Sequence, residues 1–209
     1  MSKRRYNKKR NYNNYKKREA KGVYLAKKAL RKIPHVERKN VNNVFTYNQG
    51  STATFNLLNA IAQGDTRNSR TGSKIDLKYV LIRGTVRINA SDTFTNCRLI
   101  CFIDKQPTGT APAIGSLLNV AGNPNSPLNT ASGMRYIIKW DRNIVLNQFD
   151  KQIVKFKIYA KIDKRAQYNG STATIGSLQS TGVYLFTVSD EPTNTPQIEF
   201  TTRVTFTDA

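Results

Sequence analysis

The sequence is poor in the residues that most enzyme and metal sites need. It contains one histidine, His35, and two cysteines, Cys97 and Cys101, among 209 residues. A single histidine excludes a zinc site built on several histidines. His35 lies beside Pro34 in the basic N-terminal segment, which does not favour a Ser-His-Asp triad. The phosphate-binding patterns GxxxxGK[ST] and GxGxxG do not occur. The acidic residues after residue 40 are scattered and offer no paired-carboxylate site, so the sequence does not predict an enzyme.

The two cysteines do not suggest a secreted, disulfide-rich protein either. Cys97 and Cys101 lie four residues apart in a segment expected to be a single strand, which places them on one face at a separation of about 13 Å. A disulfide requires Cα atoms within about 7 Å of each other. We therefore predict two buried free thiols.

Long apolar runs are missing as well. No segment approaches the roughly eighteen apolar residues of a membrane-spanning helix. The basic residues at the start of the sequence are not followed by the apolar core of a secretory signal. We therefore expect no membrane insertion.

Acidic residues are scarce beside the basic ones. The chain has 34 Lys and Arg against 13 Asp and Glu, a net charge of +21. Residues 1–39 hold sixteen of the basic residues and only two acids, a net charge of +14 in less than a fifth of the chain. Such self-repulsion opposes compaction and indicates an anionic partner. The candidate partners are nucleic acid, an anionic membrane and an acidic protein.

Residues 1–40 are predicted to be a basic arm. Its first part, to about residue 14, has too little apolar surface to order alone, whereas 15–33 carries an apolar stripe at helical spacing that Pro34 ends. Because the stripe is thin, we favour contact with nucleic acid over a membrane. The predicted nucleic-acid-binding residues are the fourteen basic residues of this arm up to Lys32: Lys3, Arg4, Arg5, Lys8, Lys9, Arg10, Lys16, Lys17, Arg18, Lys21, Lys27, Lys28, Arg31 and Lys32.

Residues 41–209 have the composition of strands and turns. The expected strands share alternating or short continuous apolar runs bounded by turn residues, and they lie at about 43–60, 75–89, 97–104, 134–140, 143–149, 151–162, 182–190 and 197–208. Asp141-Arg142 is expected to form a hairpin turn, and Gly84 a bulge or bend. A series of strands without βαβ alternation predicts one all-β domain, an antiparallel sandwich or barrel.

Four segments carry a family likeness. They read QGDTRNSRTG at 63–72, IRGTV at 82–86, FIDKQPTGTAP at 102–112 and VTFTDA at 204–209. In this order and spacing they resemble the coat protein of satellite tobacco necrosis virus and similar capsid proteins of small circular single-stranded DNA viruses. The resemblance implies a single eight-stranded antiparallel jelly roll, sixty copies in a T=1 icosahedral shell, and an internal arm whose helix contacts the genome.

The resemblance also implies calcium at contacts between subunits. By position, the carboxylate ligands would be Asp65 and Asp208, with backbone carbonyls from Thr71 and Lys74. The family pattern has a second acid after Asp65, where this chain has Thr66. That departure weakens the expectation of a metal site, and turn chemistry alone accounts for an Asp after Gly.

Composition and resemblance together predict a viral coat protein found in the virion, which binds its own copies and a single-stranded DNA or RNA genome. The basic clusters would also serve as a nuclear import signal before assembly. The main alternative is a cellular nucleic-acid-binding protein with a basic tail, and a second is a jelly-roll carbohydrate binder. A cationic face at 151–165 would either line the shell interior or be an ordinary solvated strand face.

Overall fold

The computed structural model describes Lys21, Val23 and residues 37–209. The chain divides into two compact units, 1–36 and 37–209. Lys21 and Val23 are helical, and the rest of the predicted 15–33 helix lies outside the described residues. The second unit is the folded domain.

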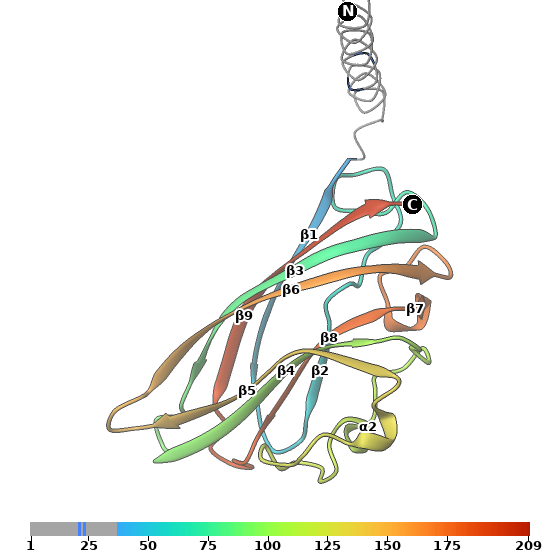
Figure 1. Cartoon of the computed structure of the whole chain (residues 1–209). Helices are drawn as coiled ribbons and strands as arrows, with labels where there is room; N and C mark the ends of the chain where they lie inside the picture. Colours follow the sequence, from blue (N-terminus) through green and yellow to red (C-terminus); the bar gives the residue numbers. More distant parts are fainter. Residues whose placement is uncertain (1–20, 22, 24–36) are drawn as a thin grey trace, which may run out of the picture. The chain divides into compact units, whose positions relative to one another are not determined.

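Nine strands build the folded domain (Figure 1). In chain order they are β1 (Lys39–Asn48), β2 (Thr54–Leu57), β3 (Lys74–Arg87), β4 (Phe94–Asp104), β5 (Tyr136–Asn147), β6 (Ile153–Tyr168), β7 (Leu178–Ser180), β8 (Gly182–Ser189) and β9 (Gln197–Asp208). The helical elements within 37–209 are short: α2 (Ile114–Leu117), η1 (Thr130–Ser132) and η2 (Ile175–Ser177). β1 begins at Lys39, so the last two residues of the predicted arm belong to a strand.

The strands form two antiparallel sheets with jelly-roll connectivity. One sheet has the order β1-β9-β3-β6-β7 and the other has the order β2-β8-β4-β5. The chain crosses between the two sheets at most connections, although β4 and β5 are neighbours in the smaller sheet. The first strand pairs with the last, with Lys39 opposite Phe206 and Asn48 opposite Gln197. The predicted eight-stranded jelly roll is confirmed, and the three-residue β7 extends the edge of the larger sheet beside β6.

Apolar side chains from both sheets meet in one large core, which includes Ile82, Phe156, Ile158, Phe200 and Phe206. A second cluster includes Ile100, Phe102, Leu117, Tyr184 and Phe186, so α2 packs with residues from β4 and β8. Because β4 and β8 thus have apolar partners on both faces, nearly all of their side chains are buried. This explains why 97–104 reads as a continuous apolar run.

The bulge expected at Gly84 lies at Lys78 instead. The register of β3 shifts between Leu77 and Tyr79 against both neighbouring strands. Gly84 keeps regular pairing, opposite Phe156 on one side and Phe200 on the other. A Cβ atom there would lie 2.5 Å from the Cβ of Phe200 and 2.7 Å from the ring of Phe156. Glycine is needed because two large core side chains approach the backbone from opposite sides.

The hairpin turn expected at Asp141-Arg142 is wrong. β5 runs unbroken through both residues, and the connection to β6 follows Asn147. The Asp141 carboxylate accepts two hydrogen bonds from Arg98 of the adjacent strand β4, at 2.8 and 2.6 Å. This bidentate pair stabilises Asp141 and Arg98 within the sheet.

Candidate nucleic-acid interface and terminal polar network

The predicted nucleic-acid-binding residues of the arm fall mostly outside the described part of the chain. Lys21 alone among the fourteen is described, and it is helical and exposed. The other thirteen lie within the residues that the structure leaves undescribed. Their role stays a prediction that rests on charge.

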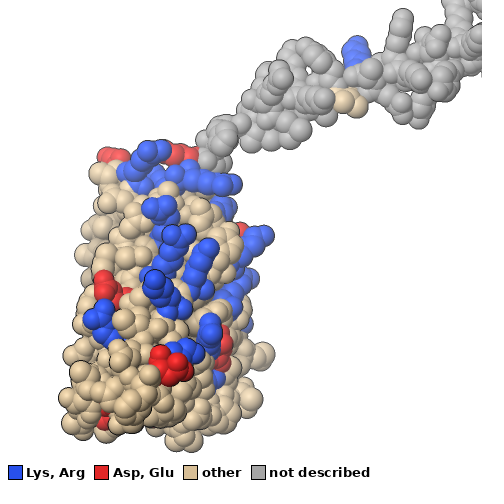
Figure 2. All heavy atoms as spheres, turned by 90° about the vertical axis from the view of Figure 1, so that its left-hand side faces the viewer, with Lys and Arg blue, Asp and Glu red and all other residues tan. Residues whose placement is uncertain are grey.

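The cationic face expected at 151–165 is present along β6. Lys155, Lys157 and Lys161 point to solvent, while the residues between them, Phe156 and Ile158, enter the core. Figure 2 shows Lys and Arg side chains gathered in a band along one face of the folded domain, with few acidic residues among them. The folded domain therefore adds a basic surface to the basic arm.

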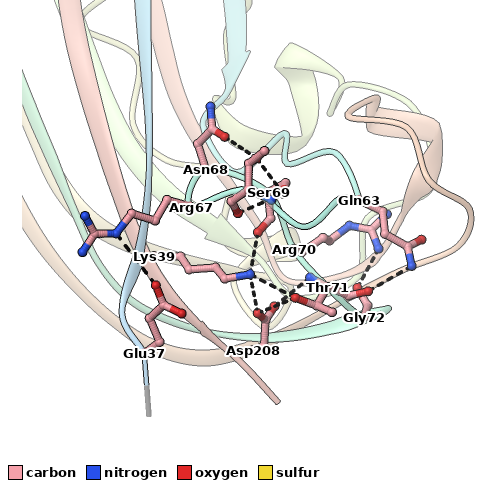
Figure 3. A network of polar contacts seen from close by, with 11 residues as sticks. Glu37, Lys39, Gln63, Arg67, Asn68, Ser69, Arg70, Thr71, Gly72 and Asp208 are labelled. Carbon is pink, nitrogen blue, oxygen red and sulfur yellow. Dashed lines mark hydrogen bonds and ion pairs between the residues drawn. The ribbon is translucent and has the colours of Figure 1, made fainter. Parts of the chain in front are cut away.

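A polar network joins the first and last strands of the folded domain (Figure 3). The Lys39 ammonium lies 2.8 Å from the Asp208 carboxylate and donates hydrogen bonds to the Ser69 carbonyl and the Thr71 hydroxyl, at 3.2 and 3.0 Å. Thr71 also donates to Asp208 through its backbone N–H and its hydroxyl. These contacts tie the start of β1, the end of β9 and the 63–73 loop together.

Asp208 is kept ionised by this network. Partial burial opposes the charged carboxylate, but hydrogen bonds from Lys39 and Thr71 outweigh that effect and lower the pKa of Asp208. The Lys39 side chain is only 9 % exposed, and its three donors all have acceptors. A buried ammonium satisfied in this way is a stable arrangement.

Arg70 anchors the same loop through its own side chain (Figure 3). Its side chain is completely buried and donates to the backbone carbonyls of Ile61, Gly72 and Gly170. The guanidinium also lies 4.5 Å from the ring centroid of Tyr168. The fork of donors on one planar group holds three chain segments together without a carboxylate.

The 63–73 loop of a single copy does not fit a calcium ion. Calcium takes six to eight oxygen ligands, usually with several carboxylates. The Lys39 ammonium already occupies the Asp208 carboxylate, and Asp65 is exposed on the loop. Within 37–209 the structure shows no cluster of three or more acidic, His or Cys residues suited to a metal. The predicted calcium would therefore need ligands from a second copy.

No sequence pattern indicated the roles of three arginines, because each of these side chains contacts residues that are distant in the chain. Besides the Arg70 cluster, Arg98 holds Asp141, and Arg135 holds the buried Asp104 through two hydrogen bonds of 2.8 and 2.7 Å. Arg98 also donates to the carbonyls of Pro124 and Ser126. These contacts fix the 63–73 loop, which leads into β3, and the long connection between β4 and β5.

Sequence comparison identifies the family. A model of the satellite tobacco necrosis virus coat protein family matches residues 1–209. The chain belongs to this family. A capsid protein of Satellite tobacco necrosis virus 1 is 30 % identical over 163 residues, covering 75 % of this chain and 80 % of the relative.

Solved structures of other plant viruses resemble the coat protein more remotely. A protein of Desmodium yellow mottle tymovirus has a TM-score of 0.39 at 8 % identity, covering 83 % of this chain and 90 % of its own. One of turnip yellow mosaic virus has a TM-score of 0.36 at 10 % identity, with 84 % of each chain covered. TM-scores this low do not establish a relationship, so the assignment rests on the family model and the capsid relative.

Membership of the family makes this chain a viral capsid protein, with a structural role in the virion. The predicted coat protein is thereby confirmed, and the alternative of a cellular nucleic-acid-binding protein is not supported. In the part of the chain that the structure describes, no helix is long and apolar enough to cross a membrane.

Proposed function

We propose that this coat protein assembles into a T=1 icosahedral shell of sixty copies and packages a single-stranded genome through its basic arm. One observation carries the proposal: the chain matches a coat protein family along its whole length, and its positive charge is concentrated in the arm that precedes the folded domain. Residues 1–36 carry a net charge of +13, and they precede a domain whose strands are fully accounted for by one jelly roll.

Electrostatics links assembly to packaging. Residues 1–36 hold fourteen Lys and Arg and one Glu, so sixty arms bring about 780 positive charges, enough to neutralise a genome of the order of a thousand nucleotides at about one charge each. Without nucleic acid these arms repel one another, and phosphate neutralisation with counterion release removes that repulsion. Because phosphate contacts are largely blind to sequence, the proposal covers DNA and RNA alike. The basic clusters also supply the chemistry of a nuclear import signal.

The test compares three versions of the chain expressed under the same conditions. They are the complete chain, a chain without residues 1–36, and a full-length chain whose fourteen arm Lys and Arg are replaced by Gln. The truncation stops before Glu37 because Lys39 belongs to the folded domain. Electron microscopy counts the particles, and the absorbance ratio at 260 and 280 nm after nuclease treatment gives their nucleic acid content.

We expect particles of sixty copies with protected nucleic acid from the complete chain only. The Gln-substituted arm should reduce protected nucleic acid well below that of the complete chain. Normal nucleic acid content in particles of either variant would show that the arm is not the binder. A complete chain that stays monomeric when polynucleotide is supplied would overturn the proposal as a whole.

A further inference from the structure

The exposed face of the larger sheet carries cations on three neighbouring strands. Arg83 on β3 lies directly opposite Lys157 on β6, and Leu81, two residues before Arg83, lies opposite Arg203 on β9. Arg87 and Lys155 continue the same exposed face. Neighbouring strands are about 4.8 Å apart and alternate residues about 7 Å apart. The five cations therefore form one continuous band, the basic sheet face.

These charges have no acidic partner within 4.0 Å in the domain, although Glu199 on β9 is exposed on the same face, opposite Thr85. None of Arg83, Arg87, Lys155, Lys157 and Arg203 forms an ion pair with another residue of 37–209. The nearby cations Lys161 and Arg165 are, by contrast, paired with Asp163 and Asp76. Like charges held opposite one another across strands are destabilising. Such a band is relieved by an anion that spans it.

Two tyrosines stand among the cations. The Tyr79 and Tyr159 rings lie 5.4 Å apart, centroid to centroid, and are tilted by 33°. Tyr159 is 64 % exposed, although folding alone would favour a polar side chain at that position. Exposed aromatic rings beside cations are the arrangement on which the bases of single strands stack.

The surface beside Arg83 is hollowed on both sides. One hollow of about 310 Å³ is lined by residues including Val44, Leu81 and Arg203. The other, of about 430 Å³, is lined by residues including Thr85, Lys155 and Lys157. A flexible chain of alternating phosphates and bases fits such a series of shallow, cation-lined depressions better than a rigid duplex does.

We propose that the basic sheet face is a second nucleic-acid-binding surface, which binds single-stranded nucleic acid independently of the arm. Arg83, Lys155, Lys157 and their neighbours contact phosphates, and the Tyr79–Tyr159 pair stacks on unpaired bases. The inference rests on the proposed function in one respect: it takes the basic sheet face to be turned toward the genome in the proposed shell.

The first test measures the affinity of the complete chain for a fluorescent twenty-nucleotide oligo(dT) as a function of salt. The face variant carries Arg83→Gln, Lys155→Gln and Lys157→Gln. The matched control carries Lys105→Gln, Lys139→Gln and Arg142→Gln, three exposed cations on or next to strands of the other sheet that form no ion pair within 37–209. Both variants lose the same charge. Circular dichroism and thermal unfolding establish that each is folded.

Each phosphate contact on a single strand contributes about 0.7 to the slope of log affinity against log salt. We expect the face variant to lower this slope by about 2 and the control to leave it unchanged. Tyr159→Leu should weaken binding about 5-fold to 100-fold without changing the slope, because stacking is not ionic. Equal slopes for the face variant and the control would overturn the inference, as would unchanged affinity in Tyr159→Leu.

The second test separates this inference from the proposed function. Ultraviolet crosslinking of nucleic acid inside purified particles, followed by mass spectrometry, should label peptides that contain Tyr79 or Tyr159. Particles whose crosslinks fall only on residues 1–36 would overturn the inference and leave arm-driven packaging intact. If no particles form, the proposed function fails, while the oligo(dT) measurements still decide whether the basic sheet face binds.

Discussion

The ammonium of Lys39 lies 2.8 Å from the carboxylate of Asp208, and this pair joins the first residue of β1 to the last residue of β9. The two strands are already paired along ten residues. The ion pair and Thr71 add the 63–73 loop to them. Replacing Lys39 therefore disturbs the strand pair and the loop together.

Lys39→Met should destabilise the folded domain by about 2 kcal/mol, because it leaves a partly buried carboxylate without its charged partner. Screening by solvent at Asp208, whose side chain is 30 % exposed, keeps the loss below that of a fully buried pair. Urea unfolding of the dissociated subunit measures the change. Arg38→Met, at an exposed neighbouring position, is the control and should change the free energy of unfolding little. Equal losses in the two variants would show that the ion pair is not the cause.

Asp208 should make stability depend on pH in the acid range. Its pKa is lowered in the folded state, so its stabilising contribution is complete above the unfolded pKa of about 4 and is lost as pH falls through the folded value. We expect Asp208→Asn to be less stable than the original chain by about 1–2 kcal/mol at pH 7, with the difference shrinking as pH falls below the unfolded pKa of about 4. Urea unfolding at pH 7, 5 and 3 measures it. A difference that is the same at pH 3 as at pH 7 would point to packing instead of charge.

Calcium should not stabilise the isolated subunit. Lys39 already neutralises Asp208, and Asp65 forms no part of that network. We expect the unfolding temperature of the dissociated subunit to stay within about 1 °C between excess calcium chloride and EDTA, since a ligand that does not bind the native state cannot shift it. The same comparison on assembled particles tests a site shared between copies. A clear rise for the subunit in calcium would contradict the fit described above.

Gly84→Ala should destabilise the core by about 2 kcal/mol or more, because the added Cβ meets the Glu199 carbonyl and the Phe200 side chain at 2.5 Å. Gly115→Ala is the matched control, since a Cβ there has no neighbour within 4 Å. Thermal unfolding of the two variants measures the difference. If both variants unfold at the same temperature, the close approach of Phe156 and Phe200 is not limiting.

The thiols should be unreactive in the native protein. Burial raises the pKa of Cys97 and that of Cys101 to about 12, so only about one thiol in ten thousand is ionised at pH 8. We expect negligible reaction with Ellman's reagent until guanidinium unfolds the chain, when two thiols should react. Dithiothreitol should leave stability unchanged, because both cysteines are free. Rapid reaction of the native protein would contradict the buried placement.

Local sequence patterns correctly predicted those features that depend only on the geometry of a single strand. Alternation along β6 predicted which side chains face the core and which face solvent, as Phe156 and Lys157 show. The four-residue spacing of Cys97 and Cys101 on one strand predicted free, buried thiols, which the structure confirms. In both cases the strand geometry itself carries the information.

Local sequence patterns failed where the role of a residue depends on a partner that is distant in the chain. Asp141-Arg142 has the composition of a turn, but Arg98, 43 residues away, keeps Asp141 within a strand. Lys39 and Asp208 are nearly the full length of the domain apart, so no spacing rule reveals their contact. The bulge was sought at Gly84, because glycine often marks one, whereas the structure uses that glycine for close packing and bulges at Lys78.

The pairing of β1 with β9 also makes the C-terminus a possible site for attaching cargo. Because the two strands are antiparallel, Glu37 and Ala209 leave the same end of the sandwich (Figure 1). A peptide fused after Ala209 would therefore start at the same end of the sandwich as Glu37, where the folded domain follows the arm. If the arms project into the lumen of the particle, a foreign enzyme or dye attached at this terminus would be carried inside with them, and each shell would become a loaded container with up to sixty guests.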